Sequence, residues 1–135
     1  MIDVNAKVLT LLEADATLVA LVGSRIYAGR DVPPPGYQPS DDGTNNPAIT
    51  FRVRGGLGFD EEDAIMTPSF QFKCYGSTEL NAQTSYRTLV DALHNGSSAD
   101  VLRGKLESPG QLLEEPGTDW PVVLCFYTVH IRAAQ

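Results

Sequence analysis

Two short amphipathic helices are predicted at the start of the chain. Asp3 and Asp15 are each placed to cap a helix, and Gly23 is placed to end the second one. The apolar residues of the first helix share one face and are Val4, Val8, Leu11 and Leu12, and those of the second are Leu18, Val19, Leu21 and Val22. Both faces need a hydrophobic partner, which the strands that follow can supply.

Two strands with alternating polarity are predicted in the middle of the chain, at residues 48–54 and 69–75. Apolar and polar residues alternate in both, which is typical of half-buried strands. We expect them to pair as an antiparallel hairpin whose connection, residues 57–66, is long and mobile. This connection contains four consecutive acidic residues, Asp60, Glu61, Glu62 and Asp63.

The longest helical pattern begins after Ser77 or Thr78 and ends before Gly96. Its apolar positions recur along one stripe, which is typical of a helix that packs on a sheet. The stripe consists of Ala82, Tyr86, Leu89, Val90 and Leu93. A third helix is therefore predicted directly after the second strand.

A long apolar strand is predicted at residues 120–132. Both of its faces are mainly apolar, so it is either central in a sheet or covered on its second face by another subunit. We expect Leu124 and Phe126 to be buried, so that a charge at either position costs several kcal/mol. The candidate core or subunit-contact residues of this strand are Val122, Leu124, Phe126, Tyr127, Val129 and Ile131.

Two segments lack a regular pattern. Residues 31–47 contain five prolines and two glycines, so we expect a long loop that holds neither a helix nor a sheet ladder. Residues 101–113 are interrupted by glycine and proline, and no element is predicted there. The order of the remaining elements predicts one α+β domain over residues 1–135, with a mainly antiparallel sheet and its helices on one face.

Composition and charge argue against two classes of function, nucleic-acid binding and membrane insertion. The chain has 135 residues, 42% of them hydrophobic, and its 10 Lys and Arg against 17 Asp and Glu give a formal net charge of -7. Proteins that hold DNA by its phosphates usually present a basic face, so tight nucleic-acid binding is disfavoured. No apolar run approaches the roughly 20 residues that cross a bilayer, and the first residues lack the pattern of a signal peptide. We therefore expect synthesis in a cytoplasm and no membrane contact.

The sequence contains no legible catalytic, metal or cofactor motif. His94, His130, Cys74 and Cys125 have no spacing that places two metal ligands on one turn, and no motif supports a cysteine nucleophile. The glycine-rich residues 55–58 lead into acids instead of a helix, which is unsuitable for a phosphate loop. We expect a protein that is not an enzyme and holds no cofactor, with both thiols as buried structural groups.

Three stretches of the chain, taken together, carry a resemblance to a known family. They are LLEADATLVALVGSRIYAGR at residues 11–30, FQFKCYGSTELNAQTSYRTLVDAL at residues 70–93 and the closing strand CFYTVHIR at residues 125–132. These stretches resemble the tail terminator family of long-tailed phages, also called tail completion or tail-to-head joining proteins. Together they cover about half the chain in the order expected of the family. Residues 31–47 are longer than the family leads us to expect.

The resemblance implies a virion protein that is made in the bacterial host and forms a homohexameric ring on the head-proximal end of the tail tube. Its implied partners are further copies of itself, the tail tube protein and the head-tail connector protein, while DNA passes through the ring without specific binding. Residues 60–63 then either face the channel, where they would repel phosphate, or form a solvated outer loop.

Two alternatives fit the same composition. One is another small virion component, such as a head-closure or minor tail protein. The other, more distant, is a small cytoplasmic enzyme or ligand-binding domain.

Overall fold

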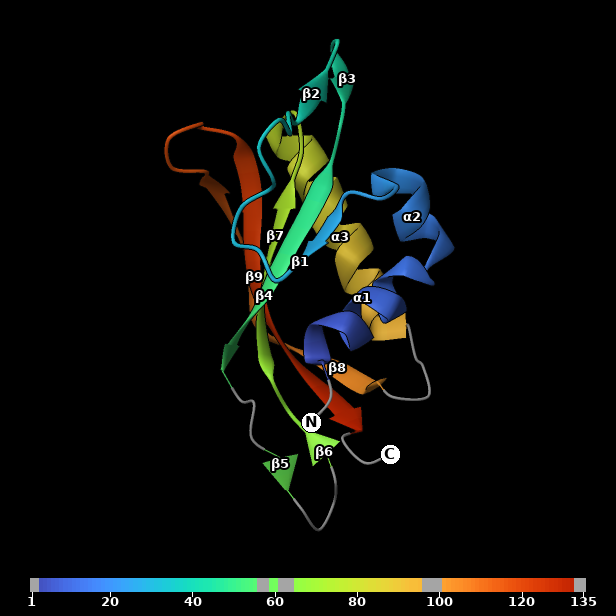
Figure 1. Ribbon diagram of the computed structural model, residues 1–135. Helices are drawn as coiled ribbons and strands as arrows, with labels where there is room; N and C mark the ends of the chain where they lie inside the picture. The colour runs from blue at the N-terminus through green and yellow to red at the C-terminus, as the bar shows by residue number, and fades with distance from the viewer. Residues whose placement is uncertain (1–2, 56–58, 61–64, 96–100, 133–135) are drawn as a thin grey trace.

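The computed structural model describes residues 3–55, 59–60, 65–95 and 101–132, which form three helices and a sheet in two layers (Figure 1). The helices are α1 (Val4–Glu13), α2 (Ala16–Val22) and α3 (Glu79–Asn95). The strands are β1 (Ile26–Ala28), β2 (Ser40–Asp41), β3 (Thr44–Asn45), β4 (Ala48–Gly55), β5 (Phe59–Asp60), β6 (Ile65–Met66), β7 (Ser69–Tyr75), β8 (Val101–Glu114) and β9 (Pro121–Arg132).

Both N-terminal helices begin and end where their sequence signals predict. The Asp3 carboxylate accepts a hydrogen bond from the Ala6 amide at 3.2 Å, and the Asp15 carboxylate accepts one from the Leu18 amide at 2.9 Å. Gly23 ends α2 with a φ of 58°, a left-handed value that glycine adopts without steric cost. The two predicted helices and their caps are confirmed.

The main sheet has the order β1-β4-β7-β9, and β9 also pairs with β6 and β8. β4 and β7 form the predicted antiparallel hairpin, with Ala48 opposite Tyr75 and Phe51 opposite Phe72. β1 joins β4 in parallel, so the sheet is mixed, although its other pairings are antiparallel. Because β7 and β8 pair with its two edges, β9 is a central strand.

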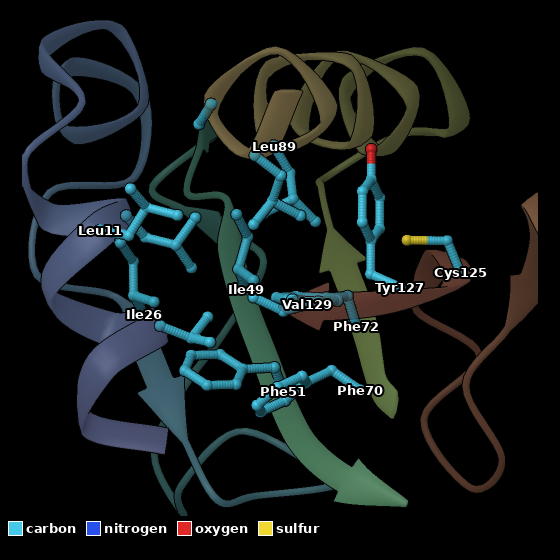
Figure 2. Close-up of a cluster of buried hydrophobic side chains, with 14 of the residues drawn as sticks. Leu11, Ile26, Ile49, Phe51, Phe70, Phe72, Leu89, Cys125, Tyr127 and Val129 are labelled. Carbon is cyan, nitrogen blue, oxygen red and sulfur yellow. The ribbon is translucent and has the colours of Figure 1, made fainter. Parts of the chain in front are cut away.

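All three helices cover the same face of the sheet (Figure 1), which confirms the predicted α+β architecture. The core lies between the two layers, where side chains of α1 and α3 meet those of β4, β7 and β9 (Figure 2). Phe51, Phe70 and Phe72 form its aromatic centre, with ring centroids 5.3–6.1 Å apart, and all three are fully buried. Aromatic rings at such distances add to the stability of a core beyond their buried area.

Two segments contain more structure than the sequence predicts. Residues 101–113, for which no element is predicted, belong to β8, whose register against β9 shifts between Val101 and Arg103, between Leu106 and Ser108, and between Ser108 and Gln111. The glycines and the proline that obscured the alternation lie at these irregularities or beside them, on a strand whose second edge is unpaired within the described residues.

The prediction that residues 31–47 hold no sheet ladder is wrong. β2 and β3 pair across a two-residue turn, Asp42 and Gly43, whose φ values of 52° and 79° are those of the turn type that suits a two-residue hairpin. The connection between β4 and β7 also holds short strands, because β5 pairs with β6 and β6 pairs with β9. Its residues 57–58 and 61–64 lie outside the described residues.

Candidate functional site: the open face of the sheet

The face of the sheet opposite the helices is formed by alternate residues of four strands and carries no helix (Figure 1). We call it the open face. Its residues from the central strands are Thr50, Arg52 and Arg54 of β4, Gln71, Lys73 and Tyr75 of β7, and Val122, Leu124, Phe126 and Thr128 of β9. The face of a sheet that no helix covers is open to solvent, to a partner or to other segments of the chain, and such segments bury Thr50, Tyr75 and Val122.

Lys73 joins two distant segments at the centre of the open face. Its ammonium lies 3.2 Å from a carboxylate oxygen of Asp31 and 3.3 Å from both carboxylate oxygens of Glu115. Glu115 is only 5% exposed and also accepts a hydrogen bond from the Tyr75 hydroxyl at 3.1 Å. Asp31 in turn accepts a hydrogen bond from the Gln71 amide at 2.8 Å. These contacts tie the start of the proline-rich segment and the turn between β8 and β9 to the same strand.

The cluster favours the ionised form of the Asp31 carboxylate and the protonated form of the Tyr75 phenol. Burial acts to raise the pKa of Asp31, but the hydrogen bond and charge of Lys73, the Gln71 amide and the Arg52 charge together hold it below its ordinary value. Burial, followed by the charge of Glu115, raises the pKa of Tyr75 far above the usual range of a phenol. Tyr75 is therefore a permanent donor to Glu115 at physiological pH.

An aromatic cluster closes one end of the open face. Tyr37, from the proline-rich segment, meets Tyr75 and Trp120 edge to face, with centroids 6.1 and 5.5 Å away. Its hydroxyl donates a hydrogen bond of 2.5 Å to the Asn46 carbonyl, and burial raises its pKa well above the ordinary value. This end of the face is thus covered by the chain's own residues.

The other end of the open face carries a partly exposed cation over an aromatic ring. The Arg54 guanidinium lies 4.0 Å from the centre of the Phe126 ring and 2.6 Å from the Glu107 carboxylate. It also donates a hydrogen bond to the Ser69 hydroxyl at 2.8 Å, and the Thr128 hydroxyl donates to Glu107. Burial acts to raise the pKa of Glu107, but its hydrogen bonds with Thr128, Ser69 and Arg54 and the Arg54 charge together lower it. The Arg54 guanidinium is thus held in place but remains accessible to a partner.

The structure divides the six candidate residues of the closing strand between two surfaces. Tyr127, Val129 and Ile131 are buried in the core beneath the helices, and Val122 is buried in the aromatic cluster of the open face. Leu124 and Phe126 are only partly buried, contrary to the expectation that both are core residues. Alternation separates them from the core, because even-numbered residues of β9 face away from the helices.

The other candidate residues give no catalytic or metal-binding arrangement within the described part of the chain. Asp60 belongs to β5, whereas Glu61, Glu62 and Asp63 lie outside the described residues. Cys74 and Cys125 are both free and buried, and burial raises the pKa of Cys125 to about 12. Among the described residues no three His, Cys, Asp or Glu side chains are grouped as a metal site would require, and no helix is long and apolar enough to span a membrane.

A surface hollow of about 270 Å³ lies between α3 and β8. Its lining contains no carboxylate, histidine or cysteine, and consists of Gln83, Tyr86, Arg87, Gly110, Leu112 and Val123. A hollow without a nucleophile or general base is not a candidate active site.

The alternation in the sequence places Arg52, Arg54 and Lys73 on the outer side of their strands, but it does not reveal their partners. Asp31 comes from the proline-rich segment, Glu107 from the interior of β8 and Glu115 from the turn directly after β8, and none of them lies in a predicted strand. Nothing in the local sequence of these acids links them to a cation 21 to 53 residues away.

Comparison with known proteins identifies a solved structure with a similar fold. No protein-family model matches the sequence, and no curated protein matches it. Among solved structures, the chain is similar to a chain described as "Virion of native gene transfer agent (GTA) particle", with a TM-score of 0.60 and 19% sequence identity. The alignment covers 92% of this chain and 90% of that one. The chain therefore shares the fold of a virion component over nearly its whole length.

Proposed function

We propose that this chain is a structural, non-enzymatic protein of a phage-like virion, and more specifically a tail terminator. In this role, a homohexameric ring of the protein sits on the head-proximal end of the tail tube, stops tube polymerisation and joins the tail to the head connector. The observation that carries the proposal is the fold likeness to a chain of a virion particle, which extends over 92% of the sequence. The resemblance of residues 11–30, 70–93 and 125–132 to tail terminators supports the finer assignment.

The two unequal faces of the sheet suit a ring subunit. A ring requires two different patches on each copy, so that one copy can bind the next head to tail. The described residues offer the open face, with partly buried Leu124 and Phe126, and exposed Leu112 and Leu113 near the end of β8. Such apolar positions among polar ones are typical of protein-protein contacts. The proposed partners are other copies, the tail tube protein and the head-tail connector protein.

Deletion of the gene from the genome that encodes the particle tests the proposal. We expect tails that grow beyond their normal length and do not join heads, and restoration of both features when the wild-type gene is supplied in trans. The matched control carries a stop codon within the gene, and suppression of that codon allows the protein to be made again. Particles of normal tail length and infectivity would contradict any structural role.

The same deletion separates the tail terminator from the second candidate. A head-closure protein seals the head, so its loss would leave tails of normal length beside heads that have lost their DNA. Tail lengths measured in micrographs and the DNA content of the heads, both from the same preparation, distinguish these outcomes.

We also propose that the acidic residues 60–63 lie at the bore of the ring. Six copies would concentrate negative charge on a narrow opening, where it repels the DNA phosphates. Changing Glu61 and Glu62 to Lys should leave folding and ring formation intact but slow genome passage, and the defect should ease with ionic strength as the charges are screened within about 8–10 Å. If these residues form an outer loop, DNA ejection rates will not change.

A further inference from the structure

The open face is rich in positive charge, although the whole chain is acidic. Of the Lys and Arg side chains that the structure describes, five fall on it by strand register, namely Arg52, Arg54, Lys73, Lys105 and Arg132. In a chain with a formal charge of -7, this concentration on one surface favours a negatively charged partner.

Not all of these cations are available. Lys73 is neutralised by Asp31 and Glu115, and Arg54 is paired with Glu107 at 2.6 Å. Arg52 is 48% exposed and reaches only Asp31, at 3.7 Å. Lys105 is exposed and has no ion pair among the described residues. Arg132, at the end of β9, is also exposed and has no ion pair among the described residues. Arg52, Lys105 and Arg132 are therefore the cations of the open face that a partner can reach without displacing a close counter-charge.

The β2–β3 hairpin presents negative charge at a fixed position. The Asn46 amide side chain donates to the Gln38 carbonyl at 2.7 Å, and the Asn45 side-chain oxygen accepts from the Ser77 amide at 3.0 Å. At the tip, Asp41 and Asp42 are exposed and neither carboxylate has an ion pair or hydrogen bond within the described residues. A short hairpin held in this way loses little conformational entropy on docking.

The hairpin is too far from the cations of its own open face to bind them. It projects beyond the Ala48 end of β4, whereas Arg52 and Arg54 lie toward the opposite end (Figure 1). Four residues of strand separate Ala48 from Arg52, which is about 13 Å, and Lys105 lies on β8, three strands away from β4. The hairpin tip is therefore placed to meet such cations on a second copy instead of those on its own chain.

We propose that the acidic tip of the β2–β3 hairpin docks on the cationic open face of a second copy, with Asp41 and Asp42 facing Arg52 and Lys105. The contact joins two different patches, so repeating it head to tail can close a ring. The inference rests on the ring that is part of the proposed function, and it names the surfaces by which the copies bind. Aspartates pair with exposed cations most strongly at low ionic strength, which also gives the contact a salt dependence.

Charge exchange between two variants tests this contact. The tip variant carries Asp41→Lys and Asp42→Asn, since Asn tolerates the left-handed backbone at that position. The face variant carries Arg52→Glu and Lys105→Glu. The control carries Glu13→Lys and Asp91→Asn, which make the same charge change as the tip variant on exposed positions of the helical side. Circular dichroism melts establish that each variant is folded, and Lys105→Glu alone replaces the face variant if the double change unfolds.

The readout is the mass of the assembly in solution, measured by light scattering and native mass spectrometry at low salt. We expect the wild type and the control to assemble, and each charge variant alone to associate roughly tenfold or more weakly. Mixing the tip and face variants should restore assembly, with both chains in one particle, because each tip then meets a face of opposite charge. No general loss of stability would be repaired by mixing.

Several results would overturn the inference. These are a wild type that stays monomeric at every concentration tested, variants that assemble as well as the wild type, or a mixture that does not recover. Binding of a short DNA duplex that the face variant loses, with assembly unchanged, would assign the open face to nucleic acid instead. If the proposed contact between copies is wrong, the tail length measured after gene deletion does not change. Failure of this inference is therefore distinguishable from failure of the proposed function.

Discussion

Replacing Lys73 with Met should destabilise the fold more than any other loss of a single positive charge on the sheet. The side chain is 14% exposed and lies between Asp31 and Glu115, whose own side chains are 45% and 7% exposed. Methionine keeps the length of the lysine stem but removes the ammonium. Glu115 is then left buried with one remaining hydrogen-bond donor described for its side chain, the Tyr75 hydroxyl.

The magnitude follows from the burial of Glu115. Removing one partner of a buried ion pair typically costs about 3–5 kcal/mol, because the other charge stays buried without compensation. The Tyr75 hydroxyl still solvates Glu115 in part, and the exposed Asp31 can bind water instead of Lys73. We therefore expect a loss of about 2–3 kcal/mol, which lowers the melting temperature by roughly 10 °C in a domain of this size.

Fluorescence of Trp120 during urea unfolding measures this loss, since the only tryptophan of the chain lies beside Tyr37 and Tyr75 at the edge of the cluster. Arg87→Met, on the exposed side of α3, is the matched control and should change stability by less than about 0.5 kcal/mol. Adding Glu115→Gln to the Lys73→Met chain should recover roughly 1–2 kcal/mol. A Lys73→Met chain as stable as the wild type, or no recovery in the double variant, would show that the cluster carries no net energy.

Three further predictions concern other parts of the fold. Gly76→Ala should cost about 1–3 kcal/mol in urea unfolding, because its Cβ would lie 2.5 Å from the backbone of Asn81; equal stability would contradict this close approach. Cys74 and Cys125 should resist thiol reagents at pH 8 until the protein unfolds, since burial raises the pKa of both, and rapid labelling of folded protein would refute their burial. The lowered pKa of Asp31 gives stability that is present above its unfolded value of about 3.8 and is lost as pH falls through its folded value; an Asp31→Asn chain with the same acid profile would argue against it.

The helices and the inner strands could be predicted because each carries a complete local signal. Asp3 and Asp15 stand directly before apolar residues at helical spacing, and the structure uses both as caps. β4 and β7 alternate up to the register shift between Val53 and Gly55, so the apolar set of each strand falls on one face and fixes the register. In these elements the local preference and the packed fold agree.

β8 and the open face could not be predicted because their order comes from distant contacts. β8 departs from simple alternation at its register shifts, and its pairing with β9 is what keeps it extended. Likewise, Glu115 reads as a surface acid in sequence, yet it is buried against Lys73, 42 residues earlier. The buried ion pair therefore became visible only when the sheet brought β7 beside the end of β8.

The uneven covering of the sheet explains why assembly contacts should fall on one surface. The helices bury the odd-numbered apolar residues of β9, so changes there act first on the fold. On the open face, Leu124 and Phe126 are only partly buried, and reachable cations stand beside them. A substitution on this side can alter how copies or other virion proteins bind while the core remains intact. Loss of assembly in a variant that melts like the wild type would therefore identify the open face as the contact surface, whereas joint loss of both would point back to the core.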